Sequence, residues 1–327
     1  MIKRILVIEN IRPKGLTMLT EEAEVVTAPD RSEATVAAMI RDFDAVITRT
    51  TKINREIIER GKRLRVIGCH SAGYDNVDLR CATDHGVCVV HTPGANTRSV
   101  AELVVGLMLA STRLLIKADY AQRVERDYSK RHQLMGHDLG GKTVGIIGMG
   151  RIGKKLARIC IAGFDMKVIG YSPSAIEKDL REIGVTKVDD VYTIFKESDF
   201  VSLNCSLSKK VQGLVNRETL RLMKPSAFLI NCARGPIIDE AALCEALKAG
   251  VIAGAALDVF DTEPTPKNNP LLDAPNLIAA PHIGTLTYES MDSMAEAVAA
   301  GVLDVLRGEK SRLLVNPEVW DKRRGIF

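Results

Sequence analysis

Short apolar runs alternate with amphipathic segments along nearly the whole chain. The apolar runs predict strands, and segments with apolar positions three or four residues apart predict helices. Alternation of the two is typical of parallel sheets with helices on both faces. The predicted strands are Arg4–Ile8, Ala45–Thr48, Val66–Gly68, Val87–Val90, Thr143–Ile147, Lys167–Tyr171, Phe200–Leu203, Ala227–Asn231, Ala253–Asp258 and Leu277–Ala279. The clearest predicted helices are Asp30–Arg41, Ser99–Ala118, Lys154–Ala162, Asp239–Ala249 and Tyr288–Leu306.

A glycine triplet, Gly148-x-Gly150-x-x-Gly153, lies between the predicted strand Thr143–Ile147 and a helical segment. This context is the one that a dinucleotide-binding turn requires. Gly148 would permit the tight turn, Gly150 would let the backbone approach a pyrophosphate, and Gly153 would let helix and strand pack closely. The phosphates would meet free N–H groups at the positive end of the helix. The alternative is a plain glycine turn in an α/β protein.

The triplet lies near residue 150 rather than at the N-terminus, so the N-terminal strands and helices are expected to form a separate sheet. Pro93 and Gly94 mark a turn just before the long helical segment that begins near Ser99. The last helix is expected to return to the N-terminal domain. We therefore predict two Rossmann-like, doubly wound α/β domains with an active-site cleft between them. Residues 1–98 plus 285–327 would bind substrate, and residues 99–284 would bind a dinucleotide.

Charge, cysteine spacing and hydropathy limit the classes of partner and the location that the sequence indicates. The net charge of +4 is small and spread along the chain, so no nucleic-acid partner is indicated. The seven cysteines form no C-x-x-C pair and no metal-binding spacing, which favours reduced thiols, a cytoplasmic location and no metal. The apolar run Leu103–Ala110 is too short to span a bilayer, and the first residues read as a strand rather than as a signal peptide.

Three side chains with complementary chemistry follow predicted strands or lie close to one. Arg234 follows the strand Ala227–Asn231, where a guanidinium can bind a carboxylate bidentately and polarise a keto oxygen. His282 follows the strand Leu277–Ala279, and histidine is the natural proton donor and acceptor near neutral pH. Glu263 would fix the tautomer of that imidazole. Read singly, these are a surface arginine, a structural histidine and a loop glutamate; together they predict an active centre for hydride transfer.

Six segments follow one another along the chain: Ala72–Asp78, Thr92–Glu102, the glycine triplet, Asn231–Gly235, Leu257–Pro264 and Pro281–Gly284. By these segments, in this order, the chain resembles the D-isomer-specific 2-hydroxyacid dehydrogenase family, in the branch of phosphoglycerate dehydrogenases and hydroxypyruvate reductases. The resemblance extends from Val66 to Trp320. Because the sequence ends soon after Trp320, we expect no C-terminal regulatory domain of the kind that some phosphoglycerate dehydrogenases carry.

The resemblance implies an oxidoreductase in which Arg234 holds substrate, His282 is the acid/base and Glu263 supports it. It also implies that the backbone of Ala72 and Gly73 binds the substrate carboxylate and that Asn96 helps to place the substrate. The segment around Ser99–Leu139 would form a homodimer interface. The positions implied to contact the cofactor are Gly148, Gly150, Arg151, Ile152, Gly153, Ser172, Cys205, Cys232, Ala233, Asp258 and Gly284.

One position departs from the NAD-binding pattern. Ser172 stands where an acidic residue usually binds the ribose 2′-hydroxyl, and no arginine follows closely to attract a 2′-phosphate. The cofactor is therefore predicted as NAD, with NADP left open. Glyoxylate, hydroxypyruvate and 3-phosphohydroxypyruvate are the candidate substrates. The alternatives are a non-catalytic, NADH-sensing corepressor-like protein and a phosphite dehydrogenase.

Overall fold

Residues 2–325 are described by a computed structural model, in which the chain forms two compact units. Unit 1 comprises the residues up to Asn96 and those from Leu286 onwards, and unit 2 comprises Thr97–Thr285. Each unit contains one parallel sheet with helices on both faces, so the predicted fold class is confirmed.

Unit 1 is built on a five-stranded parallel sheet in the order β2-β1-β3-β4-β5. Side chains of β1 and of Ile8, which follows it, alternate between the two faces of the sheet: Ile5 and Val7 pack with α12, whereas Leu6 and Ile8 pack with α2, α3 and α4. Both faces are therefore buried, as a parallel sheet requires. The strands are β1 (Lys3–Val7), β2 (Ala23–Thr27), β3 (Ala45–Thr48), β4 (Val66–Cys69) and β5 (Cys88–Val90). The helices are α1 (Pro13–Thr20), α2 (Glu33–Met39), α3 (Arg55–Arg60), α4 (Leu79–Asp84) and α12 (Tyr288–Arg307).

Unit 2 is built on a seven-stranded parallel sheet in the order β12-β11-β10-β9-β6-β7-β8. Helices α5 and α7 cover one face, and α9, α10 and α11 cover the other. The strands are β6 (Thr143–Ile147), β7 (Lys167–Tyr171), β8 (Thr186–Lys187), β9 (Phe200–Leu203), β10 (Phe228–Asn231), β11 (Gly254–Leu257) and β12 (Leu277–Ala279). The helices are α5 (Thr97–Thr112), α6 (Leu115–Tyr120), α7 (Arg151–Phe164), α8 (Glu177–Arg181), α9 (Val191–Glu197), α10 (Arg217–Leu222) and α11 (Glu240–Lys248).

The structure corrects several of the predicted elements. The sequence pattern missed β2, a half-exposed edge strand, and β8, which is only two residues long. The single helix predicted over Ser99–Ala118 is wrong, because Leu114 adopts a left-handed conformation (φ 53°) between α5 and α6. The N–H of His137 donates to the carbonyl oxygen of Thr112 at 3.0 Å, so the returning chain takes a hydrogen bond that would otherwise extend α5.

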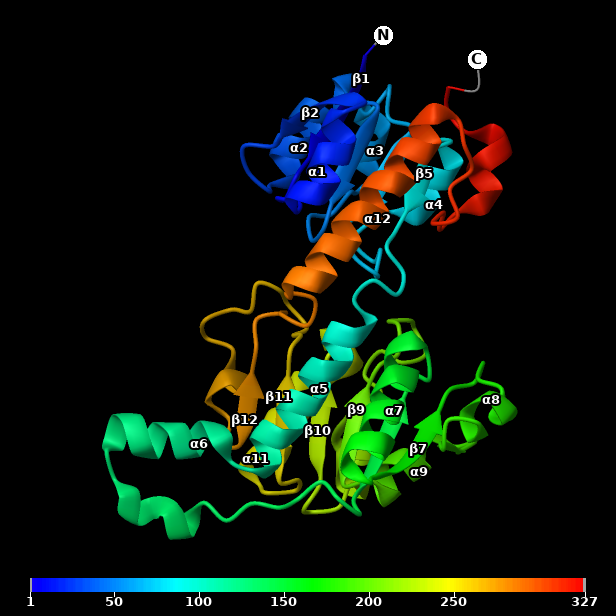
Figure 1. Cartoon of the computed structure of the whole chain (residues 1–327). Coiled ribbons are helices and arrows are strands. Elements are labelled where there is room, and N and C mark those ends of the chain that lie inside the picture. The colour runs from blue at the N-terminus through cyan, green and yellow to red at the C-terminus, as the bar shows by residue number, and fades with distance from the viewer. Residues whose placement is uncertain (1, 326–327) are drawn as a thin grey trace. The chain divides into compact units, whose positions relative to one another are not determined.

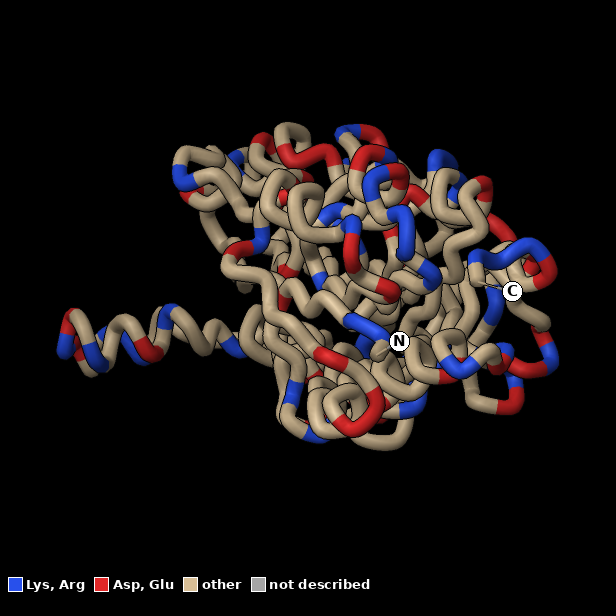
Figure 2. The backbone as a smooth tube through the Cα atoms, turned by 90° about the horizontal axis from the view of Figure 1, so that it is seen from above, with Lys and Arg blue, Asp and Glu red and all other residues tan. Residues whose placement is uncertain are grey.

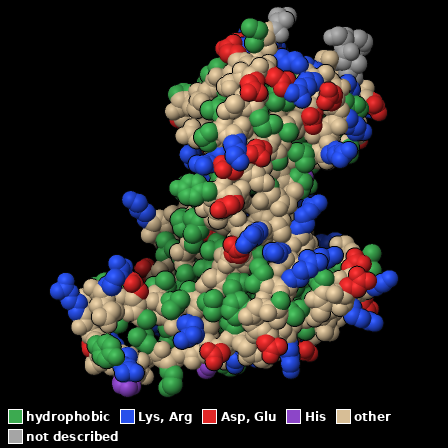
Figure 3. Space-filling model, viewed as in Figure 1, with side chains coloured by type: hydrophobic (Ala, Val, Ile, Leu, Met, Phe, Trp, Pro, Cys, Tyr) green, Lys and Arg blue, Asp and Glu red, His purple; other side chains and the backbone are tan. Residues whose placement is uncertain are grey.

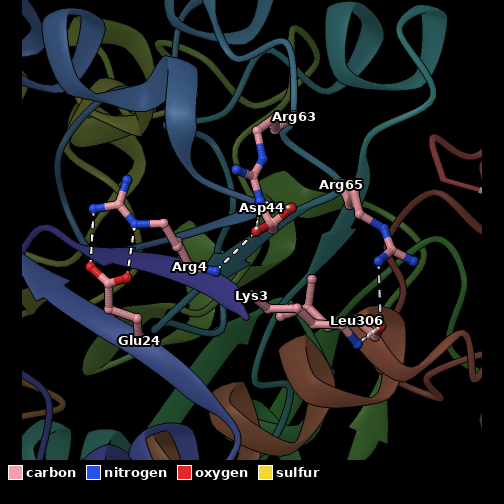
Figure 4. A network of polar contacts seen from close by, with 7 residues as sticks. All are labelled: Lys3, Arg4, Glu24, Asp44, Arg63, Arg65 and Leu306. Atoms are coloured by element: carbon pink, nitrogen blue, oxygen red, sulfur yellow. Dashed lines mark hydrogen bonds and ion pairs between the residues drawn. The ribbon is translucent and has the colours of Figure 1, made fainter. Parts of the chain in front are cut away.

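Polar contacts at the amino-terminal edge of the unit 1 sheet secure α12 (Figure 4). The side chains of Lys3 and Arg65 both donate to the carbonyl oxygen of Leu306 in the last turn of α12. Cations at this position satisfy a free carbonyl and favour the negative end of the helix dipole. In the same network, Asp44 accepts the backbone N–H of Arg4 at 2.9 Å.

At the opposite edge of this sheet, the buried carboxylate of Glu9 organises the loop after β3. It accepts the backbone N–H groups of Arg49, Thr50 and Thr51, each at 2.9 Å, and the hydroxyls of Thr50 and Thr51. Burial alone would raise the pKa of Glu9, but these hydrogen bonds outweigh it and hold the pKa below its usual value of 4.5. The ionised form therefore stabilises unit 1.

We expect Glu9→Gln to destabilise unit 1 by about 1.5–3 kcal/mol at pH 7, because an amide cannot replace a carboxylate that accepts several N–H groups. The lowered pKa means that the wild-type advantage is complete above the unfolded value of 4.5 and is lost as the pH falls through the folded value. Urea unfolding followed by the single tryptophan, Trp320 in unit 1, measures both effects. Glu24→Gln removes only an exposed ion pair and is the control. A stability difference that stays constant from pH 7 to pH 3 would contradict this account.

Candidate active site

The glycine turn after β6 lies at the topological switch point of the unit 2 sheet, where chain connections diverge to β7 on one side and to β9 on the other. Gly148 has φ 101°, and a Cβ there would lie 2.5 Å from the backbone nitrogen of Cys205, which follows β9. The loops after β6 and β9 thus approach so closely that only glycine fits. Ligands of doubly wound sheets bind at this crevice.

The other two glycines have different functions: Gly153 permits close packing, and Gly150 leaves space for a ligand. A Cβ on Gly153 would lie 2.2 Å from the carbonyl oxygen of Gly148, so this glycine lets the first turn of α7 pack on the loop. A Cβ on Gly150 would meet nothing within 4 Å, which leaves the approach to the start of α7 open. The helix begins at Arg151, three residues before the predicted start, so Arg151 and Ile152 form its first turn. Gly150 is the N-cap and offers no side-chain oxygen, which leaves N–H groups for an anion.

The predicted ribose position, Ser172, directly follows β7 and is half-buried. Two cations of α7 and α8 are partly engaged: Arg181 pairs with Glu177 at 2.6 Å, and Lys154 lies 3.7 Å from Asp179. The lysine at 178 is exposed. Because residue 172 is a serine, no carboxylate at this position repels a 2′-phosphate.

His282 and Glu263 form a direct pair. Nδ1 of the imidazole and Oε2 of the carboxylate are 2.7 Å apart, and both side chains are partly exposed. The backbone N–H of Phe260 donates to Oε1 of Glu263 at 3.1 Å and fixes the carboxylate. An ionised carboxylate can only accept, so Nδ1 carries the proton of this bond. Nε2 is then the ring nitrogen that is available for proton exchange.

The charge of Arg234 reaches the same pair. Burial of Glu263 raises its pKa, but the hydrogen bond and charge of His282, the Phe260 N–H and the charge of Arg234 together lower it. The loop that carries Arg234 is braced by Asn231, whose amide donates to the Arg234 carbonyl oxygen at 3.0 Å and accepts the Ala233 N–H at 2.9 Å. The structure therefore brings the guanidinium, the carboxylate and the imidazole together, although 48 residues separate the first from the last.

Asp258 holds the histidine loop. Its backbone oxygen accepts the N–H of His282 at 2.8 Å, and its two carboxylate oxygens accept the N–H groups of Ile283 (2.7 Å) and Gly284 (2.8 Å). His282 has φ 56°, a left-handed backbone conformation that costs a non-glycine residue about 1–3 kcal/mol. The hydrogen bonds to Asp258 hold the loop in this conformation. Sequence reasoning found Asp258 as a cofactor-contacting position but missed this loop-holding function and that of Asn231. A polar residue at the end of a strand is the only signal for either.

The remaining predicted residues lie in two places. Cys205, Cys232 and Ala233 follow β9 and β10 in unit 2, at the same sheet edge as the glycine turn. Ala72, Gly73 and Asn96 belong to unit 1, and their contact with substrate stays a prediction. The Ala72 carbonyl oxygen accepts Nδ1–H of His91 at 2.9 Å, which fixes the loop after β4.

Comparison with known proteins gives concordant matches. The sequence model described as "D-isomer specific 2-hydroxyacid dehydrogenase, NAD binding domain" matches residues 105–284. A glyoxylate reductase of Thermofilum pendens is 42% identical over 318 residues, which cover 93% of this chain and 92% of that protein. A D-3-phosphoglycerate dehydrogenase of Methanocaldococcus jannaschii is 40% identical over 98% of this chain, which spans 61% of that longer protein.

Among solved structures, the chain is similar to an NADPH-dependent glyoxylate/hydroxypyruvate reductase of Sinorhizobium meliloti in complex with NADP and malonate. The TM-score is 0.88 at 29% identity, and the match covers 99% of both chains. The likeness therefore includes both units and not the glycine turn alone.

We expect Asp258→Asn to loosen the histidine loop, because an amide nitrogen in place of one carboxylate oxygen cannot accept an N–H. Amide hydrogen exchange at Ile283 and Gly284 should accelerate, while exchange in β10 should be unchanged. Asp261→Asn is the control, since the Asp261 side chain is exposed. Equal protection of Ile283 and Gly284 in wild type and Asp258→Asn would contradict the loop-holding function.

Proposed function

Because this chain belongs to the D-isomer-specific 2-hydroxyacid dehydrogenase family, we propose that it reduces a small 2-keto acid to the D-2-hydroxy acid with NADH or NADPH, or catalyses the reverse reaction. The observation that carries the proposal is the 2.7 Å pair of His282 and Glu263 beside the charge of Arg234. All three follow strands of the sheet that also carries the glycine turn. A corepressor-like function without catalysis is not favoured, because the relatives compared above are named as reductases and dehydrogenases.

The residues around the glycine turn fit a dinucleotide. The packing glycines, Gly148 and Gly153, bring the loops together, and Gly150 leaves open the space that a pyrophosphate would fill. The first N–H groups of α7, at Arg151 and Ile152, would bind the phosphate oxygens. When bound, the nicotinamide supplies the hydride that reaches C2 of the keto acid.

Arg234, His282 and Glu263 would bind the substrate, transfer the proton and support the imidazole, respectively. Arg234 donates N–H groups to the substrate carboxylate and to the keto oxygen, which orients the carbonyl and stabilises the charge that develops there. His282, protonated on both nitrogens, donates its Nε2 proton to that oxygen. Glu263 keeps the Nδ1 proton in place and stabilises the imidazolium before transfer. Afterwards the neutral ring presents an Nε2 lone pair, which is the base that the reverse reaction needs.

The substrates that we propose are glyoxylate, hydroxypyruvate and 3-phosphohydroxypyruvate. The names of the relatives support glyoxylate and the phosphorylated acid. Ser172 supports use of either cofactor, since a serine does not exclude a 2′-phosphate as a carboxylate does, and no arginine follows closely to attract one. Of the two cofactors we propose NAD as the preferred one.

We also propose a homodimer that forms through the arm at residues 115–138. In this arm α6 and the turns that follow it extend from unit 2 with charges of both signs along them (Figure 2). Its apolar side chains are unusually exposed, including Ile116 at 60%, Tyr128 at 68% and Met135 at 84%. Ile116, Tyr120 and Leu134 line a groove of about 460 Å³ within the arm. Hydrophobic side chains are visible along the arm and on the neighbouring face of unit 2 (Figure 3), and such exposure is typical of an interaction surface.

A reducing, cytoplasmic setting completes the proposal. All seven cysteines are unpaired thiols in the structure, which is usual for proteins kept in a reducing compartment. No single helix among residues 2–325 is long and apolar enough to cross a membrane, although the bent pair Thr97–Thr112 and Leu115–Glu125 passes by length and composition alone.

His282→Gln should lower kcat by about 10²–10⁴-fold with little change in KM, because it removes the proton donor and leaves the carboxylate clamp. Arg234→Ala should raise KM and lower kcat together. Steady-state assays that follow reduced-cofactor absorbance, with the three keto acids crossed against NADH and NADPH, measure these changes. The exposed His132→Gln is the matched control. Near-wild-type rates in either active-site variant, or a wild type inactive on every 2-keto acid, would contradict the proposal.

Gly150→Ala and Gly153→Ala should separate cofactor binding from stability. A methyl at Gly150 meets no protein atom, so Gly150→Ala should unfold like wild type but bind NADH more weakly. A methyl at Gly153 lies 2.2 Å from the Gly148 carbonyl oxygen, so Gly153→Ala should lower both Tm and NADH affinity. Thermal unfolding and NADH fluorescence titration measure the pair. Unchanged NADH affinity in Gly150→Ala would place the pyrophosphate elsewhere.

Ile116→Asp combined with Met135→Asp should convert a dimer to a monomer, because it places charges on apolar surface that the second copy would bury. Light scattering coupled to size-exclusion chromatography gives the mass. Ile176→Asp changes an isoleucine of similar exposure, 64%, that lies outside the arm and should leave the dimer intact. A wild type that elutes with the mass of one chain would overturn the dimer proposal.

A further inference from the structure

A second cluster of chemically active side chains lies in unit 1, outside the residues assigned to the reaction. The carboxylate of Glu59, the thiol of Cys81 and the imidazole of His85 each offer one ligand atom, and these atoms all lie within 4.8 Å of one another. Thiolate, imidazole and carboxylate are the three side-chain ligands of Zn²⁺. We propose that Glu59, Cys81 and His85 form a Zn²⁺ site that links α3 to α4.

The spacing within α4 fits a zinc ligand pair. Sγ of Cys81 and Nδ1 of His85 are 3.5 Å apart. With a Zn–S bond of about 2.3 Å and a Zn–N bond of about 2.0–2.1 Å, tetrahedral geometry separates sulfur from nitrogen by roughly 3.5 Å. Residues four apart on a helix face the same side, so the geometry of α4 alone brings the side chains of Cys81 and His85 together.

The helices that supply the ligands are already fixed. Ile57 and Ile58 of α3 and Cys81 of α4 are fully buried in the same apolar core, so the separation of the two helices is determined before any ion binds. A preformed site of this kind loses little entropy when it takes a metal.

Each ligand can be released at small cost. The Glu59 side chain is 46% exposed, and its ion pair with Arg55 at 3.4 Å is an exposed one that contributes little. The His85 ring is half-buried, and its Nδ1 contacts the Cys81 carbonyl oxygen at 2.9 Å. A nitrogen that binds Zn²⁺ carries no proton, so the ion replaces this contact when Nδ1 becomes its ligand. Carboxylate and imidazole thus form the entrance, and the thiol forms the floor.

The thiol must lose its proton to bind a metal. Burial of Cys81 raises its pKa, and the carboxylates of Asp78, Glu59 and Asp84 act in the same direction, whereas the charge of Arg55 opposes them. The guanidinium of Arg324 also faces the thiol from the C-terminal segment, where it donates to the carbonyl oxygens of His85 and Gly61. Zn²⁺ displaces the proton from sulfur, so each ion that binds releases one proton and the affinity rises with pH.

Three protein ligands leave one position of the tetrahedron for water. In this site the ion would act as a clamp: it would connect α3 and α4 at the end where Arg324 already bridges their last carbonyls. The proposed reaction does not depend on this ion, since Arg234, Glu263 and His282 all belong to unit 2.

The test is a titration of the reduced, full-length chain with Zn²⁺ by calorimetry, together with Co²⁺ as a spectroscopic probe. Wild type should bind one equivalent and give a thiolate-to-Co²⁺ charge-transfer band. Glu59→Gln and His85→Gln should each weaken Zn²⁺ binding by at least about tenfold. Cys81→Ser should abolish the charge-transfer band. Glu56→Gln, on the same helix, and His132→Gln are matched controls that should bind as wild type does.

Stability provides a second readout. Zn²⁺ should raise the unfolding temperature reported by Trp320 in wild type but not in Glu59→Gln or His85→Gln, whose side chains lie at the surface and whose loss leaves the core intact. The proposal is overturned if wild type binds no Zn²⁺. It is equally overturned if the Glu59 and His85 variants bind with wild-type affinity while His282→Gln does not, because the ion would then belong to the active site.

Discussion

The hydrogen bond between Nδ1 of His282 and the Glu263 carboxylate is the constraint on which the site depends. It decides which ring nitrogen exchanges protons, and it places a carboxylate next to the imidazole and within reach of the charge of Arg234. Burial raises the pKa of Glu263, but the hydrogen bond to His282, the Phe260 N–H and the nearby charges of His282 and Arg234 together hold it below its usual value. The pair is maintained from outside: Phe260 fixes the carboxylate, and Asp258 holds the loop that presents the imidazole in a left-handed backbone conformation.

The parallel sheet explains why residues distant in sequence meet. Strands β6, β9, β10 and β11 all run the same way, so the loops that follow them emerge at one edge. This edge of the sheet therefore carries the glycine turn, Cys205, Arg234 and Asp258. Close packing tightens it: a Cβ on Gly235 would overlap the backbone of Phe260, so the arginine loop lies directly on the chain that leads to Glu263.

The sequence predicted the parts whose signals are local. Buried parallel strands are continuous apolar runs, and each of the ten predicted strands is present in the structure. The half-exposed edge strand Ala23–Thr27 has no such run, and its position depends on pairing with β1. The break at Leu114 follows from a hydrogen bond to His137, far along the chain, which no local pattern contains.

The same distinction applies to the site. Arg234, Glu263 and His282 could be named from residue type and position after strands. The loop-holding function of Asp258 was invisible, because it depends on two N–H groups that only the folded loop directs at one carboxylate. The grouping of Glu59 with Cys81 and His85 was equally invisible, since it requires two helices to pack.

The most direct test of the central claim is a double-mutant cycle in kcat/KM with Glu263→Gln and His282→Gln. If Glu263 acts through the imidazole, its replacement should lower kcat/KM strongly in the wild-type background and hardly at all once His282 is replaced, so the two losses should not add. Equal fold losses from Glu263→Gln in both backgrounds would show that the carboxylate acts independently and would contradict the account.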